Sequence, residues 1–169
     1  IQYQIDVGGE RLIYQLTLGV ENQKLQIRED GRWKPLPKAM YDQQIGSFGL
    51  TYEDLSLRFL YWPGGRIVGD DNIQSVDCHR VFLKNPDGHG SYDSVLLWIG
   101  KESAALMRIE GFNAKNEALK RFTVGKVMKL DGGYFVKTME VYPFLKGGRR
   151  VARPTYIEFE KPKKVAKRP

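Results

Sequence analysis

The chain has 169 residues, of which 41% are hydrophobic and 28% are charged, a composition typical of a globular protein rather than a disordered or membrane-spanning one. No apolar run approaches the roughly 20 residues that a transmembrane helix needs. The net charge is +7, but residues 146–169 contain nine Lys and Arg and two Glu, whereas residues 1–145 contain 18 basic and 18 acidic residues. The body is therefore neutral, and we expect no nucleic-acid partner.

The first predicted elements are strands. Ile1–Ile5 alternates apolar and polar residues, which is typical of a strand. Because the chain begins inside this pattern and without Met, we expect that an N-terminal portion of the protein is missing from it. Asp30-Gly31 then separates Lys24–Arg28 from Arg32–Leu36, which predicts a β-hairpin.

The stretch Gly46–Pro63 predicts a short helix. Thr51 is a favourable N-cap, and Asp54 follows three residues later, which is capping-box spacing. Three apolar residues then share one face of the helix: Leu55, Phe59 and Leu60. Because proline cannot continue a helix, we expect one helix over Thr51–Trp62.

The remainder of the chain reads as strands joined by turns rich in Gly, Asn and Asp. The expected strands are Ile73–Leu83, Tyr92–Ile99, Ala104–Phe112, Ala118–Leu130, Tyr134–Tyr142 and Pro154–Glu160. Short connections without βαβ spacing indicate an antiparallel sheet, and the continuous apolar run Val95–Ile99 indicates a sheet covered on both faces. The predicted fold is therefore mainly β: a strongly curved antiparallel sheet, or unclosed barrel, with the short helix covering or inserted in its concave face.

Residues that could carry catalysis or bind a metal are sparse. Cys78 is the single cysteine and is expected to be a buried thiol. His79 and His89 do not complete a zinc site with it, and Gly69–Asn72 reads as an acidic turn. The pair Glu53-Asp54 is explained by the dipole of the helix start. We expect no cofactor and no enzymatic activity, although a spatial cluster around either histidine would revive an enzyme hypothesis.

Large apolar side chains are concentrated around the predicted helix. A short helix over a curved sheet is one way to build a lipid pocket, and the alternative is that these side chains fill the core beneath the sheet. The candidate residues of an apolar cleft are Phe48, Leu50, Tyr52, Leu55, Phe59, Leu60 and Trp62.

A series of short motifs gives this chain a resemblance to a known family. In chain order the motifs are Gly46-Ser47, Tyr52-x-Asp54-Leu55, Phe59–Trp62, Leu97–Ile99, Leu119-Lys120-x-Phe122 and Thr155-Tyr156-x-Glu158-Phe159. Their order and spacing resemble the LolA-like outer-membrane lipoprotein-sorting proteins, also called lipoprotein carrier proteins. The resemblance spans most of residues 1–160.

The resemblance implies an unclosed barrel around lid helices and a non-enzymatic periplasmic chaperone that shelters acyl chains of lipoproteins or other lipids. It also implies inner-membrane donor and outer-membrane acceptor proteins and transient membrane contact. Residues 1–160 would form one LolA-like domain lacking the N-terminal part of the family fold, so no lid-securing residue is assigned. Residues 161–169 would form a basic, disordered tail with a signal peptide lost from the other end of the chain.

A second hypothesis stays open beside the carrier. In it the protein is a non-enzymatic peripheral interaction module, which docks on an anionic membrane or an acidic partner through its basic C-terminal region. Removal of Lys161–Pro169 separates the two hypotheses, because a carrier would keep lipid binding and a module would lose its partner.

Overall fold

The computed structural model describes residues 1–7, 9–47, 49–130, 133–145 and 153–160. The described chain is mainly β, with antiparallel pairing throughout its sheets. None of its helices has the length and apolar character needed to cross a membrane. The basic tail at residues 161–169 and the candidate Phe48 lie outside the described residues.

The largest sheet has seven strands in the order β13-β12-β11-β10-β9-β8-β7. Its strands are β7 (Arg66–Ile73), β8 (Val76–Lys84), β9 (Ser94–Gly100), β10 (Leu106–Phe112), β11 (Ala118–Leu130), β12 (Gly133–Pro143) and β13 (Thr155–Glu158). Each strand pairs with its neighbours in sequence, so the sheet is an antiparallel meander, as the short connections predicted.

The N-terminal third forms a second sheet and the helical segment. The four-stranded sheet has the order β1-β2-β3-β4, and it is followed by a small two-stranded sheet and three short helices. The bounds are β1 (Gln2–Val7), β2 (Glu10–Leu18), β3 (Gln23–Glu29), β4 (Arg32–Pro35), η1 (Lys38–Met40), β5 (Gln44–Ile45), β6 (Leu50–Thr51), α1 (Tyr52–Ser56) and η2 (Arg58–Tyr61). Between β3 and β4, Asp30 and Gly31 both have positive φ (50° and 75°), which is the hairpin turn that the sequence predicted.

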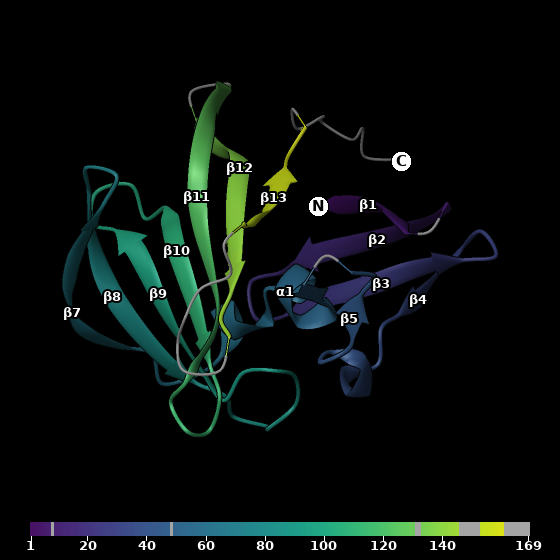
Figure 1. Ribbon diagram of the computed structural model, residues 1–169, viewed down its shortest axis with the longest axis horizontal. Helices are drawn as coiled ribbons and strands as arrows, with labels where there is room; N and C mark the ends of the chain where they lie inside the picture. The colour runs from purple at the N-terminus through teal and green to yellow at the C-terminus, as the bar shows by residue number, and fades with distance from the viewer. Residues whose placement is uncertain (8, 48, 131–132, 146–152, 161–169) are drawn as a thin grey trace.

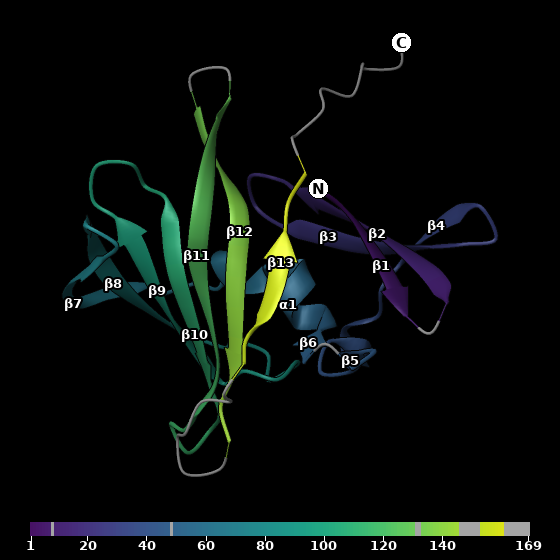
Figure 2. The same ribbon diagram turned by 45° about the horizontal axis from the view of Figure 1, so that its top comes forward.

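The helical segment lies between the two larger sheets. Figure 1 shows the curved seven-stranded sheet on the left, the four-stranded sheet on the right, and α1 with β5 between them. The tilted view of Figure 2 keeps the same arrangement, and in both views the chain start lies near β13. The predicted fold class, an unclosed curved sheet with a short helix, is confirmed.

Two apolar cores fill the space around the helical segment. The large-sheet core consists of Leu50, Phe59, Trp62, Leu83, Tyr92, Val95, Leu97, Ile109, Phe122 and Val141. The small-sheet core consists of Tyr14, Leu16, Leu25, Leu36, Tyr41, Ile45 and Leu55. On β9, Val95 and Leu97 face the large-sheet core, whereas Leu96 and Trp98 belong to a third cluster. The sheet is therefore covered on both faces there, as predicted.

The sequence placed one turn wrongly. Gly69–Asn72 was expected to be an acidic turn, but it lies within β7, and the turn falls at Gln74-Ser75. Both turn residues have positive φ (51° and 66°) without being glycine, so the usual turn signal is absent there. The expected strand Ile73–Leu83 is accordingly divided between β7 and β8.

Candidate functional site

The segment between the two cores begins as predicted but is not one helix. Asp54 accepts a hydrogen bond from the backbone N–H of Thr51 at 2.7 Å, which caps the start of α1. The helix ends after five residues because Leu57 is left-handed, with φ 50° and ψ 25°. The Ser56 hydroxyl donates to the Glu53 carbonyl at 2.8 Å and accepts from the Arg58 N–H at 3.3 Å, so a side chain replaces the next helical bonds.

The break at Leu57 turns the two halves of the segment toward different cores. Leu55 lies in the small-sheet core, with Tyr52 packed against it, whereas Phe59 and Trp62 lie in the large-sheet core. Leu57 packs against both cores. The segment therefore joins the two sheets through apolar contacts on both sides.

The structure divides the predicted cleft residues among different surroundings. Leu50, Leu55, Phe59 and Trp62 are buried, Tyr52 is half-buried, and Leu60 is 41% exposed. The structure thus brings together Leu50, Phe59 and Trp62 on one side and Tyr52 and Leu55 on the other.

A buried ionic network, which the sequence did not predict, surrounds the same segment. Glu53 is fully buried and pairs with Arg58, whose Nε lies 3.0 Å from Oε1. Oε2 of Glu53 accepts hydrogen bonds from the backbone N–H groups of Ser91 and Tyr92. A side chain at Gly90 would collide with this carboxylate, so the 85–93 loop approaches Glu53 at a glycine.

Arg58 connects this carboxylate to the rest of the loop. Its Nη1 donates to Asp87 at 3.0 Å, and its Nη2 donates to the His89 carbonyl. The guanidinium also lies 5.4 Å from the ring centroid of Tyr41 and 5.3 Å from that of Trp62, which are cation–π distances. Arg58 is thus held from several sides and is itself buried.

Asp54 anchors the same helix to the seven-stranded sheet. Its carboxylate accepts hydrogen bonds from the Tyr92 hydroxyl at 2.6 Å and from Nζ of Lys120 on β11. Lys120 is also buried. The two acidic residues that the sequence assigned to the helix dipole are therefore the centres of a buried network, and this interpretation of them was incomplete.

The network shifts the pKa values of its members in opposite directions. Burial raises the pKa of Glu53, and the Arg58 charge works against that rise. Burial and the neighbouring Asp54 carboxylate raise the pKa of Tyr92 well above its ordinary value. Burial would also raise the pKa of Asp87, but hydrogen bonds from Arg58 and Lys38 outweigh it and hold that pKa well below the usual range.

The far end of the four-stranded sheet opens into two cavities. One, of about 370 Å³, is lined by Glu10, Arg11, Leu12, Ile27, Arg28, Glu29 and Asp30. The other, of about 250 Å³, is lined by Ile27, Glu29, Lys34, Pro35, Leu36, Pro37 and Met40. Because Ile27 and Glu29 line both, the cavities adjoin. Five of the seven residues that line the first cavity are charged, whereas five of the seven that line the second are apolar.

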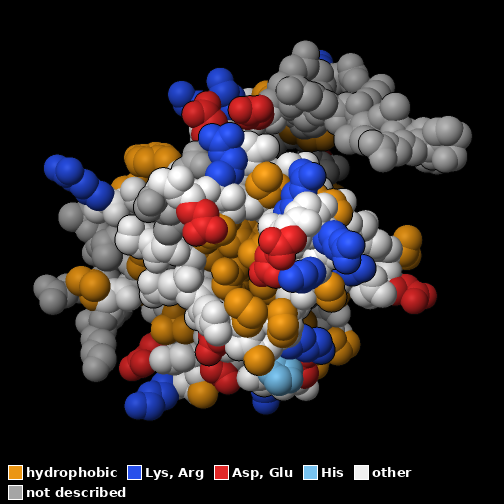
Figure 3. All heavy atoms as spheres, turned by 90° about the vertical axis from the view of Figure 1, so that its right-hand side faces the viewer, with side chains coloured by type: hydrophobic (Ala, Val, Ile, Leu, Met, Phe, Trp, Pro, Cys, Tyr) orange, Lys and Arg blue, Asp and Glu red, His pale blue; other side chains and the backbone are white. Residues whose placement is uncertain are grey.

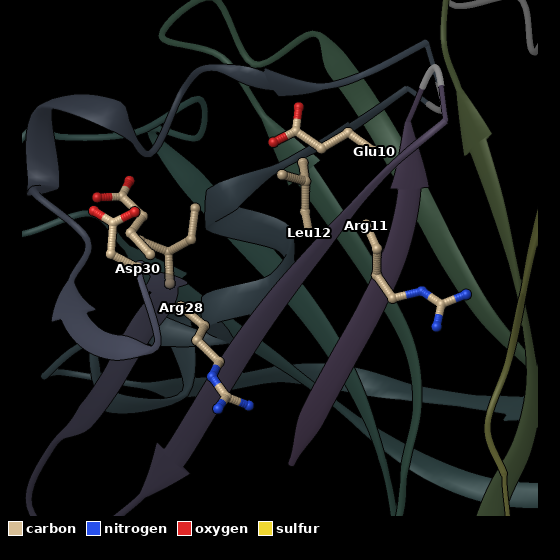
Figure 4. Close-up of a pocket in the computed structure, with 7 residues that line it drawn as sticks. Glu10, Arg11, Leu12, Arg28 and Asp30 are labelled. Atoms are coloured by element: carbon tan, nitrogen blue, oxygen red, sulfur yellow. The ribbon is translucent and has the colours of Figure 1, made fainter.

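These cavities have an apolar floor and a charged rim. Leu12, Ile27 and Met40 pack against the small-sheet core, so the floor continues inward toward Leu55 of α1. In Figure 3, which views this side of the molecule, apolar side chains gather in the middle with acidic and basic ones around them. Figure 4 shows the side chains of Arg11 and Arg28 extending away from the carboxylates of the rim.

An exposed ion-pair cluster is centred on Asp70 of β7. Asp70 lies 2.8 Å from His79 Nδ1 and 2.6 Å from Lys101 Nζ, and the hydrogen bonds from Lys101 and His79 lower its pKa. Cys78 is a buried free thiol, as expected. Within the described ranges, no group of three His, Cys, Asp or Glu side chains is arranged to hold a metal.

The chain is similar to one known protein family in sequence and to several solved structures in fold. A family model whose description reads "Uncharacterized protein" matches residues 12–166. The chain belongs to this family. No curated protein is significantly similar to its sequence.

Three solved structures are similar to the chain, and they share a LolA-like fold with it. A DUF1329 family protein from Desulfovibrio piger has a TM-score of 0.63 and 18% identity, with 82% of this chain and 60% of that one covered. An outer membrane lipoprotein-sorting protein domain from Vibrio parahaemolyticus has a TM-score of 0.63 and 17% identity, and the match covers 79% of this chain and 57% of that one. A LolA superfamily protein from Nitrosomonas europaea has a TM-score of 0.61 and 16% identity, and the match covers 96% of this chain and 83% of that one. The chain thus spans less than two thirds of the first two structures.

Proposed function

We propose that the protein is a non-enzymatic carrier that shelters acyl chains of lipoproteins or other lipids in an apolar cleft. We place it in the periplasm, between inner-membrane donor and outer-membrane acceptor proteins. The LolA-like fold supports this proposal, since one structural neighbour is described as a lipoprotein-sorting domain. We also propose that residues 1–160 act as one domain, because segment 50–62 contributes to both cores.

One observation carries the proposal: the inner face of the four-stranded sheet is apolar, opens to solvent at one end and is closed by α1 at the other. Along β2 the side chains on this face run from Leu16 and Tyr14, both buried, to the half-buried Leu12 and the exposed Glu10. An acyl chain would lie along this face with its polar end at the rim. In this structure the depth of the face is filled by Leu55.

Transfer energetics explain why such a carrier needs a movable closing element. Each buried CH₂ group contributes about 0.8 kcal/mol, so a sixteen-carbon chain gains roughly 12 kcal/mol from leaving water. A cleft that captured all of that free energy would not release its cargo. Leu55 already occupies part of this apolar surface, so its displacement by an acyl chain and its return would favour release.

The test is uptake of a fluorescent sixteen-carbon fatty acid, followed by competition with unlabelled palmitate and with a diacylated peptide. The wild-type chain should bind, and Ile27→Glu should weaken binding by at least about tenfold, because the charge would stand in the cavity wall. Ile67→Glu is the matched control. Ile67 is also an isoleucine on a strand, but it lies outside the cleft and is 62% exposed. Absence of uptake by the wild-type chain, or equal loss in both variants, would refute the proposal.

A further inference from the structure

The β11–β12 hairpin projects beyond the rest of the seven-stranded sheet (Figures 1 and 2). β10 pairs with β11 as far as Thr123, and β13 pairs with β12 as far as Thr138. Beyond these points the described residues of the two strands pair with each other, and one more backbone hydrogen bond, from the Phe159 N–H to the Lys137 carbonyl at 2.8 Å, follows the end of β13. We call residues 126–129 and 135–137 the distal ribbon.

The distal ribbon exposes apolar side chains on both of its faces. Val127 is 51% exposed and Phe135 is 41% exposed. Val127 lies opposite Val136, whereas Phe135 lies opposite Met128 on the neighbouring strand. Since adjacent residues of a strand point to opposite faces, the two exposed side chains stand on different sides of the ribbon.

The charge of the ribbon has one dominant sign. Lys126, Lys129 and Lys137 are all exposed, and residues 124–139 contain one acidic residue, Asp131, against these three lysines. Lysine on an unshielded strand also prevents edge-to-edge aggregation. That role explains the lysines, but it does not explain a large aromatic and a branched apolar side chain exposed beside them.

We propose that the distal ribbon is a membrane-docking element that inserts Val127 and Phe135 among the head groups of an anionic bilayer. Apolar side chains flanked by lysines match the boundary between acyl chains and anionic head groups. Because Val127 and Phe135 stand on opposite faces, both faces of the described ribbon can meet lipid. This surface belongs to β11 and β12, whereas the proposed cargo cleft belongs to the four-stranded sheet.

The experiment is sedimentation of the full chain with vesicles of phosphatidylcholine, with and without phosphatidylglycerol. We expect binding to the anionic vesicles that weakens as salt is added. Val127→Ser combined with Phe135→Ser should weaken it by about tenfold or more. The matched control is Val20→Ser with Ile67→Ser, which removes two apolar side chains that are 100% and 62% exposed elsewhere.

A second pair of variants separates local charge from net charge. Replacement of the three ribbon lysines by Gln should weaken binding to anionic vesicles more than the same change at three other exposed lysines: Lys24, Lys84 and Lys115. All four variants should take up the fluorescent fatty acid as the wild-type chain does, so failure of the carrier proposal would be seen separately. The inference is overturned if the wild-type chain does not bind, if ribbon and control variants bind equally, or if only deletion of residues 161–169 abolishes binding.

Discussion

The four-stranded and seven-stranded sheets both present an apolar face to segment 50–62, but they differ in how completely that face is covered. Over the seven-stranded sheet, the covering residues include Phe59 and Trp62, and the core residues Val95 and Val141 are completely buried. Over the four-stranded sheet, the cover ends near Leu55 and the face continues outward into the two cavities. The small-sheet core is also fully buried at Tyr14 and Leu16, so the two sheets differ at the open end of the smaller one, where its apolar face reaches solvent.

The largest expected effect comes from the network that holds the segment between the sheets. Glu53→Gln removes the fully buried one of the two carboxylates that pair with Arg58 and leaves only Asp87. Loss of a buried charged partner costs about 3–5 kcal/mol of unfolding free energy. Urea denaturation measures it. The control is Glu29→Gln, which breaks the exposed pair with Lys34 and should cost about 1 kcal/mol or less. Similar values for the two variants would mean that the buried network does not secure the segment.

The next effect compares the two apolar faces directly. Leu97→Ala removes a side chain that is 2% exposed in the large-sheet core and should cost about 3 kcal/mol. Leu12→Ala removes a half-buried side chain from a cavity wall, and it should cost about 1 kcal/mol because fewer contacts are lost there. Thermal or urea unfolding distinguishes them. Equal losses would contradict the view that the small-sheet face is the more open one.

The smallest effect is a pH dependence at the loop that clamps Arg58. Because the pKa of Asp87 is held below its unfolded value near 3.9, its ionised form stabilises the fold above that value. This contribution begins to decline as the pH falls below about 4, and it is lost progressively as the pH approaches the lowered pKa of the folded state. Asp87→Asn should therefore be less stable than the wild-type chain at pH 6, and the difference should narrow at pH 3. Denaturation curves at both values measure it, and a constant difference would exclude Asp87 as its source.

Sequence reasoning succeeded where structure is set by local patterns. Asp30-Gly31 predicted its hairpin because few other residue pairs adopt left-handed conformations readily, and the strand Ala118–Leu130 was predicted with its observed bounds. It failed at Gln74-Ser75, where the same backbone conformation occurs without glycine. Such a turn is imposed by the pairing of the strands around it rather than by its own residues.

The site shows a second limit of sequence reasoning. From the sequence, Glu53 was assigned to the helix dipole, and Arg58 was not singled out. Charged residues are seldom buried, and the burial of these two depends on groups that are distant in the sequence. A usable signal was that Glu53 and Arg58 are opposite charges five residues apart in a segment rich in large apolar side chains. No sequence pattern predicted the cavities at the end of the four-stranded sheet, because Leu12 and Ile27 look like ordinary strand residues.

The bonding of the two acidic residues on α1 also has a consequence for the order of folding. Glu53 requires backbone donors 38 residues later in the chain, and Asp54 requires Lys120, which is 66 residues away. Contacts so distant in sequence form slowly, since long loops must close first. Segment 50–62 is synthesised early, and Glu53 can gain its donors once the 85–93 loop has been made, but Asp54 can gain Lys120 only after β11 has been made. The network that ties the segment to the seven-stranded sheet is therefore completed late in folding.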